Sequence, residues 1–150
     1  MQKLFSGSLL LILFSLFVIN SCSSDDERMT CFTPPEPIVF AFLDNAGNNL
    51  IENGTLSVSQ IKVREIVDEN TQYPINFNQI QNKIVLQEIG FSAGTKHYTL
   101  SSPLVDFEFA VTSSEITGSC SGYRIDEVNF NGVVPESDGY TTFVIRLDVP

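Results

Sequence analysis

The sequence predicts an all-β protein, a single antiparallel β-sandwich of about seven strands. Three observations indicate this fold class. Apolar and polar residues alternate over short segments, most clearly from Val105 to Val111, as in a strand that is buried on one face. Clusters of Gly, Asn, Asp and Pro separate these segments at roughly even intervals. After residue 21, no segment has the periodicity of a long amphipathic helix.

The first strands are expected on either side of a polar turn. Ile38 to Leu43 is apolar on both faces, which is typical of a central strand. Asp44 to Asn49 is the turn, because Asp, Asn and Gly tolerate left-handed backbone. Gln60 to Val67 follows as a less regular strand. The residues expected on its apolar face are Ile61, Val63 and Val67.

The second half of the chain contains the clearer strand patterns. The segment from Gln72 to Lys83 is polar and is compatible with a helical turn. Ile84 to Ile89 and Lys96 to Leu100 are expected to be short strands. Tyr123 to Phe130 precedes Asn131-Gly132, which is a hairpin-turn signal. A last strand runs from Thr141 to Val149, with its apolar residues on one face.

The first 21 residues have the features of a secretory signal peptide. Lys3 is followed by Leu9 to Ile19, eleven residues of which only Ser15 is polar. This run is shorter than the ~20 apolar residues that a membrane-spanning helix needs, but it fits the apolar region of a signal peptide. The expected organisation is a signal peptide over 1–21, an acidic and Pro-rich tether over 22–37, and a sandwich domain over 38–150.

The residues around the expected cleavage point resemble a bacterial lipobox. Ile19-Asn20-Ser21-Cys22 has a branched aliphatic residue, a tolerant position, a small residue and then the obligatory cysteine. The resemblance implies cleavage before Cys22 and lipid attached through its sulfur. Two or three acyl chains anchor a protein stably, whereas one binds only marginally. The membrane is therefore the first expected partner.

An acidic block follows Cys22 directly. Ser23-Ser24-Asp25-Asp26-Glu27 resembles the signal that sends some lipoproteins of Bacteroidetes across the outer membrane, with Ser24, Asp25, Asp26 and Glu27 as its core. That resemblance implies a protein on the outer membrane that faces the cell exterior. A solvated acidic linker is the alternative, and it would fit a structural or assembly lipoprotein facing the periplasm.

A short motif adds a resemblance at the level of the fold. Asp44-x-x-Gly47-Asn48-x-Leu50, placed between two strands, is similar to the first hairpin of transthyretin-like and other immunoglobulin-like bacterial modules. Together with the lipobox and the Pro-rich segment, it makes the chain resemble the small β-sandwich lipoproteins of Bacteroidetes. This resemblance implies no catalytic residues.

The net charge limits the kinds of partner that the protein can bind, and the cysteine content bears on the redox state of its compartment. The chain has 8 Lys and Arg against 18 Asp and Glu, a net charge of −10, and removing Lys3 with the signal peptide leaves −11. This charge argues against binding nucleic acid or anionic lipid. Besides Cys22, the chain has Cys31 and Cys120. In an oxidising compartment they are expected to form a disulfide, with free thiols or a metal pair as alternatives.

Candidate catalytic and metal-binding groups are sparse. The oxygens of Asp44 to Asn49 do not have EF-hand spacing, so a turn is the simpler interpretation. Asp106 and Glu108 are expected on a solvated strand face, and Asp126 and Glu127 on opposite faces. His97 is the only histidine, and the chain has no G-x-S-x-G motif that would supply a catalytic serine beside it. A catalytic pair of His97 with Cys120 stays open. We therefore expect no enzyme activity, no metal and no cofactor.

The function expected from these features is a non-enzymatic binding or accessory module of unknown protein or glycan ligand. Sandwich domains bind through end loops or by adding a strand at an exposed edge. A cluster of exposed aromatic side chains on one sheet would favour a glycan, although tyrosines at strand ends often pack half-buried. The candidates are Tyr73, Tyr98, Tyr123 and Tyr140.

Overall fold

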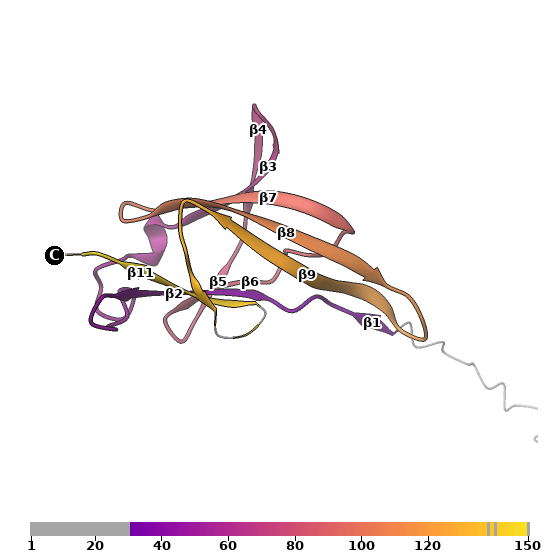
Figure 1. Cartoon of the computed structure of the whole chain (residues 1–150), viewed down its shortest axis with the longest axis horizontal. Coiled ribbons are helices and arrows are strands. Elements are labelled where there is room, and N and C mark those ends of the chain that lie inside the picture. Colours follow the sequence, from indigo (N-terminus) through magenta and orange to yellow (C-terminus); the bar gives the residue numbers. More distant parts are fainter. Residues whose placement is uncertain (1–30, 138, 140, 150) are drawn as a thin grey trace, which may run out of the picture. The chain divides into compact units, whose positions relative to one another are not determined.

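The computed structural model describes residues 31–137, 139 and 141–149. The signal peptide, Cys22, the acidic block and Tyr140 lie outside the described residues. Within that part, the fold is a sandwich of two β-sheets, and its only helical element is one turn of 3₁₀ helix, Val58–Gln60 (Figure 1). The predicted fold class is confirmed. The compact unit begins at Cys31 rather than at Ile38, because the first strand lies within the segment expected to be tether.

The larger sheet has six strands. In spatial order they are β1 (Phe32–Thr33), β9 (Ser121–Asn131), β8 (Asp106–Ile116), β7 (Gly94–Ser101), β3 (Lys62–Asp68) and β4 (Thr71–Ile75). All neighbours are antiparallel except β1 and β9, which are parallel. The strands β3 and β4 form a hairpin that projects from the rest of the domain (Figure 1).

The smaller sheet has five strands. In spatial order they are β10 (Glu136–Ser137), β11 (Thr142–Leu147), β2 (Ile38–Asp44), β6 (Lys83–Leu86) and β5 (Asn78–Ile80). β11 pairs with β2 in parallel. The described residues thus form eleven strands in two mixed sheets, where about seven antiparallel strands were predicted. The sheets are mixed because β1 and β11 each pair with a neighbour in parallel orientation. The count is higher because the short strands β1, β4, β5 and β10 were not predicted.

Apolar side chains from the two sheets meet in a single core. Phe40 of β2 is at its centre and is completely buried. Its ring makes edge-on contacts with rings of the opposite sheet, at centroid distances of 5.7 Å to Phe107, 5.4 Å to Phe109 and 6.2 Å to Phe130. Such contacts add to the free energy of burying apolar area. The predicted burial of β2 on both faces and the predicted alternation along β8 are confirmed.

Three local predictions are wrong. Val67 is 54% exposed, because a register shift between Ile66 and Asp68 takes it out of the alternation. The polar segment 72–83 forms β4 and β5 instead of a helical turn, and Gln81 and Asn82 turn the chain into β6 with positive φ of 50° and 58°. Asn131-Gly132 does not close a hairpin, because the next strands, β10 and β11, belong to the other sheet.

Candidate functional site

A disulfide closes the end of the domain at which the described chain begins. Cys31 and Cys120 are bonded, with their Cα atoms 4.7 Å apart and a sequence separation of 89. The predicted pairing is confirmed. It joins the start of the chain to the β8–β9 loop and places β1 beside the beginning of β9. Since the sulfur of Cys120 is bonded to Cys31, it offers no thiol for the alternative pairing with His97.

The approach of β1 to β9 requires a glycine. A Cβ atom added to Gly122 would lie 2.0 Å from the carbonyl oxygen of Thr33. The two backbones pair only at Phe32↔Ser121 and Thr33↔Gly122. Pro34 follows at once and has no N–H to donate to a ladder, so the chain leaves the sheet there and crosses to β2.

This crossing leaves most of the β9 edge unpaired. Beyond Gly122, no described strand pairs with β9 on the side away from β8. No backbone hydrogen bond from a described loop reaches Tyr123 to Asn131 either. An edge of this kind presents N–H and C=O groups that can pair with an extended peptide. We call the residues Tyr123 to Asn131 the β9 edge.

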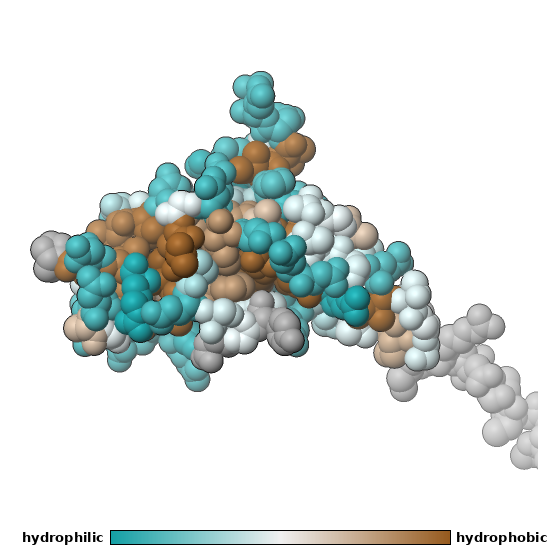
Figure 2. All heavy atoms as spheres, in the orientation of Figure 1, coloured by the Kyte–Doolittle hydropathy of each residue, from teal (hydrophilic) through white to brown (hydrophobic). Residues whose placement is uncertain are grey.

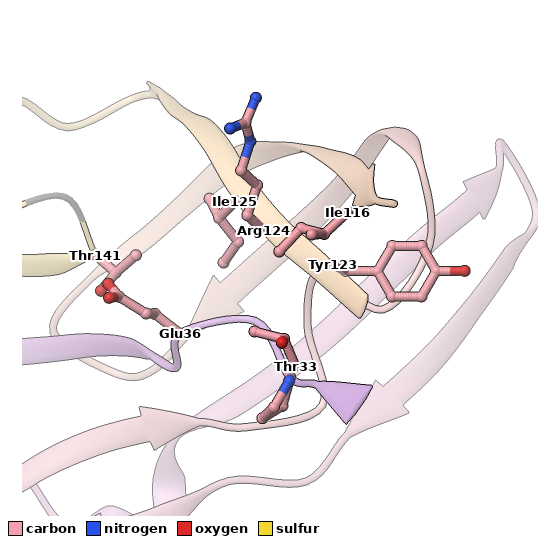
Figure 3. Close-up of a pocket in the computed structure, with 8 residues that line it drawn as sticks. Thr33, Glu36, Ile116, Tyr123, Arg124, Ile125 and Thr141 are labelled. Atoms are coloured by element: carbon pink, nitrogen blue, oxygen red, sulfur yellow. The ribbon is translucent and has the colours of Figure 1, made fainter. Parts of the chain in front are cut away.

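A pocket of about 290 Å³ lies where the β9 edge and the crossing chain separate. The crossing chain contributes Thr33, Pro34 and Glu36, and the opposite wall comes from β8, β9 and the residue before β11. Those wall residues are Ile116, Tyr123, Arg124, Ile125 and Thr141. Figure 3 shows Glu36 and Thr141 at one end of the pocket and Tyr123 at the other.

The pocket presents one free carboxylate. Figure 3 shows Arg124 directed away from Glu36, and its guanidinium Nε donates to Asp126 Oδ1 at 2.9 Å and to Ser114 Oγ at 3.2 Å. Glu36 is exposed and makes no ion pair with a described residue. The pocket therefore combines one acid, the hydroxyl groups of Thr33, Tyr123 and Thr141, and apolar walls. These groups together suit a long side chain that ends in a cation.

The predicted position of Asp126 is corrected by a bulge in β9. Thr112 pairs with Glu127 and Ser113 pairs with Ile125, so Asp126 is an extra residue in its strand. Asp126 lies beside Arg124 and Ser114 on the exposed face, instead of on the face opposite to Glu127. It therefore restrains the only arginine that lines the pocket.

The remaining predicted groups lie on turns and on the outer face. Asp44 accepts hydrogen bonds from the backbone and the side chain of Asn48, both at 2.8 Å, which lower the pKa of its carboxyl group and confirm the turn. His97 is exposed and lines a hollow of about 260 Å³ with Glu108, Asn129 and Asn131. In the described part of the chain, no three His, Cys, Asp or Glu side chains are grouped as metal ligands would be.

Tyr73, Tyr98 and Tyr123, the three tyrosines that the structure describes, do not form a platform for sugars. Tyr98 is buried and stacks on Phe109 at 5.2 Å, and burial, with a smaller effect of Glu65, raises the pKa of its phenol. Tyr73 is 57% exposed on the projecting hairpin, and Tyr123 is half-buried. The exposed aromatic cluster contains Phe32 and Phe91 with Tyr123, and the two phenylalanines were not predicted from the sequence. In the sequence, the one feature that could have drawn attention to Phe32 is its position next to Cys31, a cysteine predicted to be paired.

No protein-family model, no curated protein and no solved structure matches this chain. The class that the fold defines is a two-sheet, mixed β-sandwich with a disulfide at one end. Among the described residues, no helix has the length and apolar character needed to cross a membrane.

Proposed function

We propose that this protein is a lipid-anchored binding module that takes up an extended segment of a partner protein along the β9 edge. The anchor is Cys22. Because Cys31 and Cys120 are joined to each other, Cys22 is the one cysteine left for another role. Its place after Ile19-Asn20-Ser21 supports lipidation.

The observation that carries the binding mode is the open β9 edge beside the pocket. A partner strand can pair with the free backbone groups of the β9 edge. This backbone pairing supplies affinity that does not depend on the sequence of the partner. The neighbouring pocket adds specificity, since Glu36 attracts a cationic side chain and the walls accept its apolar stem. The net charge of the chain, −10, favours the same kind of partner and repels acidic ones. A protein with a basic, extended segment therefore fits better than a glycan.

The anchored module is placed on the outside of the outer membrane. Ser24, Asp25, Asp26 and Glu27 act as the export signal. Replacing Asp25, Asp26 and Glu27 by alanine retains the protein inside, where protease added to whole cells does not reach it. Equal cleavage before and after the change would make the acidic block a linker and would favour the periplasm-facing alternative.

Lipidation is tested by growing cells with an acyl chain that carries a chemical label. Wild-type protein takes up the label, and Cys22→Ala does not and accumulates as precursor. The matched control is the double variant Cys31→Ser and Cys120→Ser, which removes the two other cysteines and keeps the label. Mature Cys22→Ala protein in the membrane fraction would refute the anchor.

The binding edge is tested with a photocrosslinking residue at position 124, which lines the pocket. The control carries the same residue at position 72, which is exposed on the projecting hairpin. We expect a discrete crosslinked partner on cells from position 124 and none from position 72. The Glu36→Lys change should weaken the crosslink, because it reverses the charge in the pocket. Equal crosslinking from both positions would contradict a specific edge.

A further inference from the structure

Two exposed phenylalanines stack on each other at the disulfide end of the domain. Phe32 is 51% exposed and Phe91 is 43% exposed, and their ring centroids are 6.3 Å apart with planes inclined by 11°. Tyr123 packs against Phe32 edge-on, at 6.5 Å and 64°. Aromatic rings of this size are normally buried in a core, so a pair left in water indicates a surface with a partner.

A proline-lined groove extends this aromatic surface. The groove has a volume of about 330 Å³ and is lined by Pro34, Pro35, Pro37, Gln87 and Phe91, none of which is charged. Phe91 belongs to both features, so the cluster and the groove are continuous. We call the exposed residues Phe32, Phe91, Pro34 and Pro37 the apolar ledge; Pro35, which also lines the groove, is buried. Figure 2 shows apolar atoms at the end of the domain where the described chain begins.

The position of the ledge in the chain indicates what covers it. Phe32 directly follows Cys31, which the disulfide holds to the β8–β9 loop. Only Ser23 to Thr30 separates Cys31 from Cys22. Eight residues span at most ~28 Å when fully extended, and about 15 Å on average as a flexible chain. A lipid on Cys22 would therefore keep the ledge next to the bilayer surface.

We propose that the apolar ledge inserts into the interfacial region of the bilayer that holds the anchor, and so fixes the orientation of the sandwich. This inference rests on the proposed lipidation of Cys22. Aromatic rings favour the boundary between headgroups and acyl chains. Because the tether holds the ledge close to the bilayer, the effective concentration of the ledge at the membrane surface is high. A contact with the bilayer that is too weak to recruit a free protein is then populated. The ledge carries no cation, and the chain is acidic, so the surface it suits is zwitterionic.

This orientation is compatible with the proposed binding edge. β9 begins beside β1 at Ser121 and Gly122 and continues to Asn131 (Figure 1). With the ledge in the bilayer, β9 leads away from the membrane. Pro34 lines both the groove of the ledge and the pocket, so the pocket lies at the membrane surface, and the part of the β9 edge beyond Ile125 stays accessible to a partner.

The test uses the absence of tryptophan from the chain. Phe91→Trp places a single fluorophore on the ledge, and Tyr73→Trp places one at an exposed site on the projecting β3–β4 hairpin. Each variant is purified from the expressing cells in its lipid-bearing mature form and is reconstituted into phosphatidylcholine vesicles with brominated acyl chains. We expect Phe91→Trp emission to shift to shorter wavelength and to lose most of its intensity, while Tyr73→Trp keeps its intensity. Phe32→Trp is a second reporter that should behave like Phe91→Trp.

The outcomes separate the two proposals. Protein that does not float with the vesicles would refute the lipid anchor itself. Protein that floats, with Phe91→Trp and Phe32→Trp quenched no more than Tyr73→Trp, would overturn the membrane-seated ledge and leave the anchor intact. A blue-shifted but unquenched Phe91→Trp would also overturn it, because the ledge would then be covered by protein rather than by lipid.

Discussion

Substituting Gly122 by alanine should separate β1 from the sheet. The methyl group would lie 2.0 Å from the carbonyl oxygen of Thr33 and 2.8 Å from its carbonyl carbon. Both are backbone atoms, so no side-chain rotation relieves the contact. A carbon and a carbonyl oxygen rest at roughly 3.3 Å, and the two strands must therefore move apart by about 1.3 Å.

That movement breaks the two-residue pairing of β1 with β9. Each backbone hydrogen bond contributes a net ~0.5–1.5 kcal/mol, and overpacking by one methyl group costs about 1–3 kcal/mol. The strand is short and at an edge, so part of the strain can relax. We expect the free energy of unfolding to fall by about 2–3 kcal/mol. The disulfide next to β1 keeps the strand near the domain even when it is unpaired.

Urea unfolding followed by circular dichroism measures the change, with an unchanged slope expected because the same surface is exposed. Gly54→Ala separates steric from backbone effects, because Gly54 has a φ of +79° and no atom within 4 Å of the added Cβ. It should cost about 1 kcal/mol. Ser121→Ala, at the neighbouring exposed position, should stay within about 0.5 kcal/mol of wild type. If Gly122→Ala unfolds at the same urea concentration as Ser121→Ala, the close approach of β1 to β9 is refuted.

The remaining predictions concern the core, the disulfide and alkaline pH. Phe40→Ala, at the centre of the core, should lower the free energy of unfolding by ~3–5 kcal/mol, and a loss below that of an exposed-site variant would contradict its burial. Replacing Cys31 and Cys120 by serine should lower it by up to ~4–5 kcal/mol and should increase amide exchange in β1 first; protection of β1 unchanged by the loss of the bond would contradict this. Burial raises the pKa of Tyr98 in the folded state, so the contribution of its neutral phenol is complete below the usual pKa of 10.0 and is lost as pH rises above it. Tyr98→Phe should therefore remove part of the stability loss seen above pH 10.0, and equal alkaline sensitivity in both proteins would exclude this cause.

Strand positions and strand faces could be predicted where the alternation is uninterrupted. Phe107, Phe109 and Val111 are buried as the pattern of β8 indicates, and Asp106 and Glu108 are exposed. The prediction failed where a bulge shifts the register by one residue, at Val67 in β3 and at Asp126 in β9. A bulge arises from the pairing of a strand with its neighbour, so the alternation of residues within one strand does not predict it.

The candidate site was beyond prediction for a related reason. The pocket brings together Thr33 and Glu36 of the crossing chain, Arg124 of β9 and Thr141 before β11, three segments that are far apart in the chain. Nothing in the local pattern of these residues distinguishes them from other polar residues at strand ends. The apolar ledge is similar, because Phe32 and Phe91 stack only after the disulfide has placed β1 beside β9.

The sequence by itself determined the fold class, the burial of β2 and β8, the turn at Asp44 to Asn49 and the pairing of Cys31 with Cys120. These features depend on side-chain periodicity, on the backbone freedom of turn residues and on the small number of cysteines. The parallel placement of β1 and β11, the open β9 edge and the contact between Phe32 and Phe91 were decided only by the tertiary structure. The physical reason is that a strand's pattern specifies which face it buries, whereas its neighbour is chosen by the competition of all strands for the same sheet edges.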